Sequence, residues 1–288
     1  MKKSLSAWNK LIKPRVSILV LVTVLPGLYL GTDSGFDWKI FTISMIGTFL
    51  MSSASFMLNQ YIERELDSKM ERTKNRPLPQ GDIKPLTALL TAMLFIIVSF
   101  YILYAFINLL TAAVTLSGLL FYIFIYTILL KPRTQYNIVI GGAAGSIGPL
   151  IGYAASSNSL PVPAWVLFAM IFFWTPPHFW ALAIFLKEDY SAAHFPMKPI
   201  VSGIEKTTRS IFHYTIIYAL FCIGFYFSDP KIGLVYLIPT IALSIWIIYL
   251  SINLKRQQSV PLAKKFFFIS IVHLFVINIL IVIDYSVV

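Results

Sequence analysis

NQYIERELDSKMERTKNRPLPQG, at residues 59–81, is a charged stretch between two long apolar runs. Offsets of 10, 14 and 17 residues from its Asp67 lead to Pro77, Gly81 and Lys84. The same offsets from Asp189 lead to Pro199, Gly203 and Lys206, around a second charged stretch, LKEDYSAAHFPMKPIVSG, at 186–203. We interpret the match as an internal repeat whose charged elements face one site, because repeats in membrane proteins commonly meet at such a site. The alternative is coincidence, since Gly, Pro and Lys all gather at helix boundaries.

The composition is that of a multi-pass membrane protein. Hydrophobic residues make up 58% of the 288 residues and charged residues only 12%, which is more apolar surface than one soluble domain could bury. Runs of about 20 apolar residues, enough to cross roughly 30 Å of hydrocarbon, predict nine transmembrane helices in one all-α domain, 1–288. They lie near 15–32, 38–58, 84–104, 107–130, 137–156, 163–186, 209–228, 231–251 and 265–285. The duplicated halves would be helices 1–4 and 5–8.

The positive charges alternate along the chain. Of 23 Lys and Arg residues, 21 fall in alternate connections, and only Lys39 and Lys231 lie in the others. By the positive-inside rule the N-terminus is cytoplasmic and, with nine spans, the C-terminus is outside. The net charge of +11 therefore reflects topology, so we expect membrane lipid as a partner and no nucleic acid. An Arg- and Ser-rich presequence is absent, which favours a bacterial plasma membrane over an organelle.

The first charged stretch predicts a metal site. Asn59, Glu63 and Asp67 are four residues apart, so on a helix continuing the second span they stack on one face. Such oxygen ligands suit Mg²⁺, which typically uses one or two carboxylates plus substrate phosphates. Arg72 and Arg76 follow and could neutralise a diphosphate. The alternative is a solvated loop whose acids and bases pair with each other.

The second charged stretch brings Lys187 and Asp189 to the same side of the membrane. His178 precedes Asp189 by eleven residues, so we expect the two to share a face of the sixth helix, with His178 about 16 Å deeper. An ionisable side chain within the apolar layer is a functional candidate by default. The alternative is a histidine bonded to a neighbouring carbonyl.

The run GGAAGSIGPLIG, at 141–152, matches neither nucleotide-binding fingerprint. It predicts a small-residue helix face that lets a neighbouring helix or a flat ligand approach closely.

Four stretches resemble the UbiA superfamily of intramembrane prenyltransferases, and within it the branch that modifies haem. They are KPR at 13–15, NQYIERELDSKMERTKNRPL at 59–78, KPRTQYNIVIGGAAGSIGPLIGY at 131–153 and TPPHFWALAIFLKEDYSAAHFPMKPIV at 175–201. The resemblance implies a nine-helix bundle whose metal motif, N-x-x-x-D-x-x-x-D, falls on Asn59, Glu63 and Asp67. Glu63 departs from the usual Asp, and its extra methylene moves the carboxylate by roughly 1.5 Å. The family's second motif falls on Lys187, Asp189 and Tyr190.

The reaction that the resemblance implies is transfer of farnesyl from farnesyl diphosphate to a vinyl group of haem b, with addition of water. Mg²⁺ would be held by Asn59, Glu63, Asp67 and Asp189. Lys131 and Arg133 would join Arg72, Arg76 and Lys187 around the diphosphate, and His178 would lie in the haem pocket. A haem A synthase or the terminal oxidase assembly is the expected downstream partner. One alternative is a related prenyltransferase acting on an aromatic quinone precursor. A second is a secondary transporter, although the clustering of acids at one membrane face argues against it.

Overall fold

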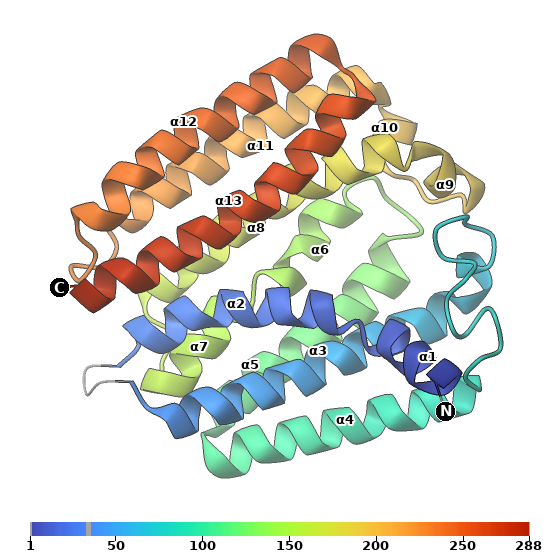
Figure 1. Cartoon of the computed structure of the whole chain (residues 1–288), viewed down its shortest axis with the longest axis horizontal. Coiled ribbons are helices and arrows are strands. Elements are labelled where there is room, and N and C mark those ends of the chain that lie inside the picture. Colours follow the sequence, from blue (N-terminus) through green and yellow to red (C-terminus); the bar gives the residue numbers. More distant parts are fainter. Residues whose placement is uncertain (1, 33–35, 288) are drawn as a thin grey trace.

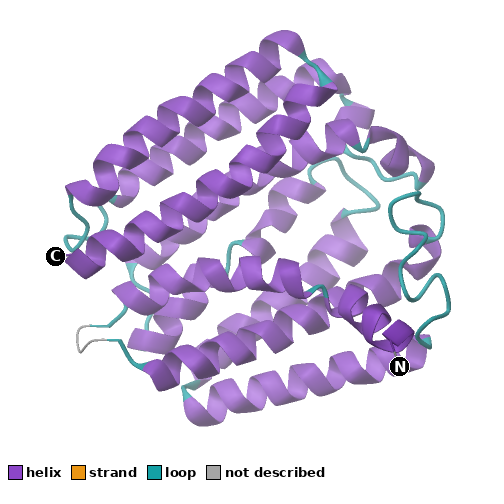
Figure 2. Ribbon diagram, in the orientation of Figure 1, coloured by secondary structure: helices purple, strands orange, loops and turns teal. Residues whose placement is uncertain are grey.

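The chain folds into a helical bundle (Figures 1 and 2), seen in a computed structural model that describes residues 2–32 and 36–287. Within those residues nine helices are long and apolar enough to cross a membrane. This confirms the predicted nine spans and the all-α class. Residues 1 and 288 of the predicted single domain, and residues 33–35, lie outside the described part.

Six of the nine spans among the described residues are single helices, and the other three are each built from two shorter helices. The elements are α1 (Lys2–Ile12), α2 (Pro14–Leu30), α3 (Trp38–Asp67), α4 (Pro85–Phe106), α5 (Leu109–Leu120), η1 (Phe121–Leu130), α6 (Asn137–Gly145), α7 (Gly148–Ser157), α8 (Val162–Phe185), α9 (Lys187–Ala192), α10 (Lys198–Val201), α11 (Gly203–Phe225), α12 (Leu234–Gln257) and α13 (Val260–Val287).

Breaks within spans occur where the backbone leaves the helical region or a proline enters. Lys13, with φ 53°, separates α1 from α2, and Pro14 then begins α2. Pro149 opens α7 and ends the ladder of α6, because a proline has no N–H to donate. The fifth predicted helix, 137–156, is therefore two short helices, and the first span begins with a short helix that hydropathy alone did not predict.

The sixth span ends before Asp189, although the predicted shared face of His178 and Asp189 required one helix to contain both. Helix α8 stops at Phe185, and Leu186, with φ −108° and ψ 22°, turns the chain into the separate helix α9. The expected shared face of His178 and Asp189 is therefore wrong, because a constant rise along one helix does not connect them.

One end of the bundle collects the connections between α3 and α4, between η1 and α6, and from α8 to α11 (Figure 1). We call it the basic end, because it carries the charged stretches 64–84, 131–133 and 187–209. Gly81 and Gly203, the glycines of the proposed repeat, both adopt left-handed backbone there, with φ 74° and φ 80°. That conformation favours glycine, so each position has a local reason for its residue, and the repeat itself stays a prediction.

Two apolar clusters flank the middle of the bundle. One is formed mainly by α1, α3, α4, α5 and η1, and includes Met51, Met57 and Leu119. The other is formed mainly by α8 and α11–α13, and includes Leu167, Trp180 and Phe266. Between them α2, α6 and α7 pack with the residues that line a central cavity.

The glycine run packs helices closely, as its composition predicts. A Cβ atom added at Gly152 of α7 would collide with the backbone of α2 at Val24, and one added at Gly27 of α2 would collide with the backbone of Pro149. At Gly142 of α6 a Cβ would lie 3.1 Å from the Thr175 side chain on α8. Small residues thus bring α2 against α7 at backbone distance, the packing that membrane helices use in place of a hydrophobic driving force.

We predict that Gly152→Ala lowers the free energy of unfolding by about 1–3 kcal/mol, because the added methyl meets immovable backbone. Thermal unfolding in detergent measures the change. Gly224→Ala is the matched control, since a Cβ at this position of α11 meets nothing within 4 Å. It should raise the free energy of unfolding by up to about 1 kcal/mol through the helix propensity of alanine. Equal effects of the two substitutions would contradict the close packing.

Candidate active site

Helix α3 continues unbroken past the apolar layer to Asp67 and carries the predicted polar face. Asn59, Glu63 and Asp67 occupy successive turns of it, and all three are buried. Asn59 Nδ2 donates to the hydroxyl of Thr127 on η1, 3.2 Å away. The carboxylates of Glu63 and Asp67 follow toward the basic end. The predicted stacking of these three residues on one helix face is confirmed.

Each buried carboxylate has one cationic partner from another segment. Lys131 Nζ lies 2.5 and 2.6 Å from the two carboxylate oxygens of Glu63. Arg76 Nη1 donates to Asp67 Oδ2 at 2.6 Å, and the hydroxyl of Thr73 fixes the same loop by donating to the Asp67 carbonyl. Both pairs are needed once the carboxylates are buried, because a buried charge without a partner is very unfavourable.

The second charged stretch meets the first through aromatic residues. Lys131 Nζ lies 4.6 Å from the centre of the Phe195 ring, so one lysine contacts both stretches. The Tyr190 phenol is buried within electrostatic range of Glu63, Arg72 and Arg76. Burial raises the pKa of Tyr190 and Glu63 raises it further, while Arg72 and Arg76 act in the opposite direction. The phenol therefore stays protonated and can donate a hydrogen bond into the site.

Asp189 is at the same end but does not join the carboxylates of α3. It is the neighbour of Tyr190 on α9, and of the two only Tyr190 is buried, within electrostatic range of Glu63. Among the described residues no three Asp, Glu, His or Cys side chains form a metal-binding group. Of the four predicted metal ligands, the structure thus brings together three: Asn59, Glu63 and Asp67.

The predicted diphosphate ligands fall into two groups. Arg76 and Lys131 pair with the two carboxylates, and Arg72, although exposed, lies within electrostatic range of the neighbouring Tyr190. Lys187 is exposed on α9, and Arg133 is exposed and donates to the carbonyls of Ile128 and Leu129 at the end of η1. These two residues lie outside the cluster.

Lys13 is a member of the cluster that the sequence did not identify as a site residue. Its ammonium lies 5.2 Å from the centre of the Phe56 ring and within electrostatic range of Arg76, Asp67 and Lys131. The break between α1 and α2 at this residue places it there. The only signal in the sequence was its place in the KPR stretch at 13–15, with no acidic residue nearby.

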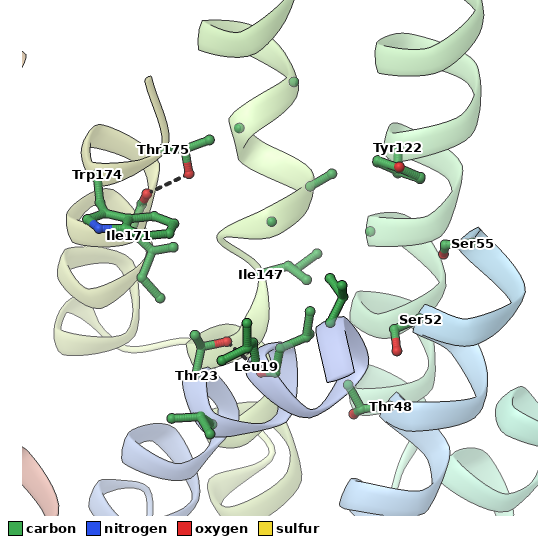
Figure 3. Close-up of a pocket in the computed structure, with 18 of the residues that line it drawn as sticks. Leu19, Thr23, Thr48, Ser52, Ser55, Tyr122, Ile147, Ile171, Trp174 and Thr175 are labelled. Atoms are coloured by element: carbon green, nitrogen blue, oxygen red, sulfur yellow. Dashed lines mark hydrogen bonds between the residues drawn. The ribbon is translucent and has the colours of Figure 1, made fainter. Parts of the chain in front are cut away.

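An apolar cavity of about 360 Å³ adjoins the charged cluster on the side toward the middle of the bundle. Its walls come from α2, α3, α5, η1, α6, α7, α8 and α13, and Figure 3 shows Leu19, Thr48, Tyr122 and Trp174 on different sides of it. The junction with the cluster is formed by Tyr122 and Tyr126, which line the cavity and lie within electrostatic range of Glu63. One site therefore has a charged end and an apolar interior.

The two tyrosines are placed by an irregular helix. Over Phe121–Leu130 the chain winds in wide π-helical turns, with the amide of Lys131 bonded to the carbonyl five residues back. Tyr122 and Tyr126 stack with ring centres 5.5 Å apart, and Gly141 leaves room for Tyr126. Wide turns of this kind are frequent at functional sites.

The residues that could hold a magnesium ion fit it in chemistry. Glu63 and Asp67 offer two carboxylates, and Asn59 Oδ1 makes no hydrogen bond within the described chain. Mg²⁺ usually binds through one or two carboxylates and completes its shell with water and substrate phosphate. Lys131 and Arg76 now neutralise the same carboxylates, so both kinds of cation suit these positions.

His178 lies in the wall of the cavity. Its ring is 6% exposed, and its Nδ1 atom is 2.8 Å from the hydroxyl of Ser270 on α13. The alternative weighed from the sequence, a histidine bonded to a neighbouring carbonyl, is close to what is found, with a serine hydroxyl as the direct partner. The ring nevertheless keeps an edge at the cavity.

Comparison with known proteins gives a match over most of the chain. Residues 20–272 match the model of the UbiA prenyltransferase family. A protein from Leptospira biflexa named protoheme IX farnesyltransferase is 59% identical over 277 residues, 96% of this chain and 98% of that protein. A protein from Pseudoalteromonas atlantica named protoheme IX farnesyltransferase 2 is 40% identical, with 96% and 91% of the two chains covered.

Solved structures share the fold at low identity. A digeranylgeranylglyceryl phosphate synthase structure superposes with a TM-score of 0.82 at 18% identity and covers 100% of both chains. A UbiA homolog from Archaeoglobus fulgidus, bound to DMAPP and Mg²⁺, gives 0.74 at 16% identity, with 98% and 99% covered. The fold is thus shared with a UbiA homolog whose structure contains DMAPP and Mg²⁺.

We predict that Lys131→Met lowers the free energy of unfolding by about 3–5 kcal/mol in the absence of substrate and metal, because it leaves the Glu63 carboxylate buried and unpaired. Adding Glu63→Gln to that variant should restore most of the loss. Lys74→Met, which breaks an exposed pair with Glu71, is the control and should change the value by no more than about 1 kcal/mol. Thermal unfolding of the wild type, the two single variants and the double variant gives the coupling free energy between Lys131 and Glu63. Additive effects of Lys131→Met and Glu63→Gln would contradict the buried pair.

Proposed function

Because the chain belongs to the UbiA prenyltransferase family, we propose that it transfers the farnesyl group of farnesyl diphosphate to a vinyl group of haem b, with addition of water, to give haem O. The observation that carries this is the joining of a buried cationic cluster to an apolar, aromatic-lined cavity. Relatives up to 59% identical, matched over nearly their full length, carry the name protoheme IX farnesyltransferase, which supports haem over a quinone precursor as the acceptor.

The charged cluster would bind the diphosphate. Arg72, Arg76 and Lys131 would donate charge-assisted hydrogen bonds, each worth on the order of 1.5–3 kcal/mol, and Tyr190 would add a neutral donor. Arg133 and Lys187, being outside the cluster, would act only at longer range. A magnesium ion held by Asn59, Glu63 and Asp67, with Asp189 as a further candidate, would stabilise the negative charge of the departing diphosphate.

The cavity would hold the farnesyl chain and a porphyrin edge. As the bond between farnesyl C1 and the diphosphate oxygen breaks, positive charge develops on C1 just below the cluster. The stacked rings of Tyr122 and Tyr126 lie at this junction, and aromatic faces attract cations. The apolar walls keep bulk water away from the cation until the vinyl carbon has attacked.

The sidedness of the site follows from the charges. We propose that the basic end faces the cytoplasm of a bacterial inner membrane, where farnesyl diphosphate is water-soluble enough to arrive from solution and the positive-inside rule is met. The product would pass to an enzyme that further oxidises the haem, or to assembly of a terminal oxidase.

The test of this function is an assay of the purified protein with haem b, farnesyl diphosphate and Mg²⁺, followed by mass spectrometry of the porphyrins. A haem carrying farnesyl plus one water is the expected product. A product formed only with an aromatic quinone precursor would refute haem as the acceptor, and two unaltered compounds would refute transferase activity.

Removing one carboxylate should abolish turnover. We predict that Asp67→Asn reduces kcat by at least about a hundredfold, the usual loss for one electrostatic group at a reacting centre, while Glu63→Asp, which restores the usual family motif, stays active. Asp189→Asn decides whether Asp189 also binds metal, in which case activity falls and more Mg²⁺ is needed for half-maximal rate. Substantial activity in Asp67→Asn would contradict the metal assignment.

Removing a positive charge from the cluster should weaken the binding of farnesyl diphosphate and leave the binding of haem nearly unchanged. We predict that Arg76→Gln raises KM for farnesyl diphosphate by about tenfold or more, given the strength of a charge-assisted hydrogen bond, and leaves KM for haem nearly unchanged. Arg133→Gln is the control, since Arg133 is exposed and outside the cluster, and should have a much smaller effect. Equal changes in both Michaelis constants would place the diphosphate elsewhere.

A further inference from the structure

Aromatic neighbours stack on the ring of His178, so that only its edge can contact a molecule in the cavity. The indole of Trp174 stacks on it, with ring centres 4.3 Å apart and planes 17° apart. Phe267 also stacks on it, at 4.4 Å and 23°. With flat neighbours this close, the ring cannot rotate freely, and its nitrogen atoms point along fixed directions.

The hydrogen bonds around the ring assign its tautomer. Ser270 Oγ donates its single proton to the carbonyl of Phe267, 2.7 Å away. In this arrangement its oxygen accepts from His178 Nδ1, which lies 2.8 Å away, and the proton is then on Nδ1. A neutral imidazole has one donor and one acceptor nitrogen, which leaves Nε2 with a lone pair.

That lone pair is at the cavity. His178 lines the cavity, and Nε2 has no hydrogen-bond partner among the described residues, yet it is not one of the fully enclosed polar atoms. Neighbouring polar atoms of this wall are engaged: Trp174 Nε1 donates to the Ser270 carbonyl at 2.9 Å, and Thr175 Oγ1 donates to the Ile171 carbonyl at 2.9 Å. A water molecule in the cavity beside His178 would thus find Nε2 as a free acceptor.

We propose that His178 Nε2 accepts a proton from the water that completes the reaction, and that Ser270 is the positioning residue that fixes the required tautomer. The inference rests on the proposed function. The terminal vinyl carbon forms a bond to farnesyl C1 as diphosphate leaves with the bonding electrons, and the inner vinyl carbon becomes cationic. Water oxygen then bonds to that carbon, and the proton it loses passes to Nε2.

The tautomer is tested without substrate. Nitrogen-15 NMR of histidine-labelled protein in detergent distinguishes protonated from unprotonated ring nitrogens, and the His178→Gln spectrum identifies the signals of His178. We expect a protonated Nδ1 and an unprotonated Nε2 in the wild type, and a mixture of tautomers in Ser270→Ala. A wild-type ring protonated at Nε2 would overturn the proposal.

The proton transfer is tested by the ratio of two products. If His178 does not accept the proton from water, the cationic adduct instead loses a carbon-bound proton to the departed diphosphate and gives an alkene lighter by one water. We expect His178→Gln to lower the ratio of hydrated to dehydrated adduct by about a hundredfold, the usual contribution of a general base. Ser270→Ala should lower it by about tenfold, and Ser270→Thr, which keeps the hydroxyl, should restore it.

Ser286→Ala is the matched control. Ser286 is an exposed serine of the same helix whose hydroxyl donates to a carbonyl four residues back, and its loss should leave the ratio unchanged. A wild-type ratio in His178→Gln would overturn the proposal, as would a changed iron spectrum of bound haem with an unchanged ratio, which would make His178 an iron ligand. A wild type that forms no farnesylated haem would instead refute the proposed function, and the NMR result would still decide the tautomer.

Discussion

The contact between Lys131 and Glu63 is the interaction on which the site depends. It joins the end of α3 to the end of η1 across 68 positions of sequence, with both carboxylate oxygens engaged. The same ammonium lies against Phe195, so the connection after α9 is held by it too. A buried carboxylate needs a partner, and a chain that places Glu63 on the inward face of α3 must bring a cation to it. The segments of the basic end fold over the cavity and bring Lys131 to Glu63, which supplies that cation.

The division of the site into a charged end and an apolar interior follows from the membrane. Cations and carboxylates are tolerated where the helices end near water, whereas deeper polar groups must be bonded within the bundle. Thr127, Thr175 and Ser270 follow this rule, since the hydroxyl of each donates to a backbone carbonyl. A reaction that needs both a diphosphate site and a dry chamber therefore has one natural position, where the two environments meet at Tyr122 and Tyr126.

The sequence predicted the parts that depend on local pattern. Nine apolar runs could be counted because each span must cross the bilayer, and the face formed by Asn59, Glu63 and Asp67 follows from helical spacing alone. Other features depend on contacts between distant segments. Lys13 reaches the cluster only through a break in the first span, and Asp189 lies on a helix separate from that of His178 because α8 ends four residues before it. Neither break has a periodic signal. The proline at 149 could have indicated the division of the fifth span, but hydropathy passes through it unchanged.

The wide turns of η1 have a consequence for how this chain tolerates changes in length. A hydrogen bond that reaches five residues back accommodates more residues in each turn than a regular helix does, so one residue could be deleted within Phe121–Leu130 and the backbone could still close as an ordinary α-helix. Such a deletion would preserve hydrophobicity, span length and helicity. It would, however, leave one residue fewer between Tyr122 and Lys131 and change the angle between their side chains, so Lys131 would no longer face Glu63. Residue number in this segment is therefore constrained as strictly as residue type, and an insertion or deletion that looks harmless by composition would separate the charged end from the chamber beneath it.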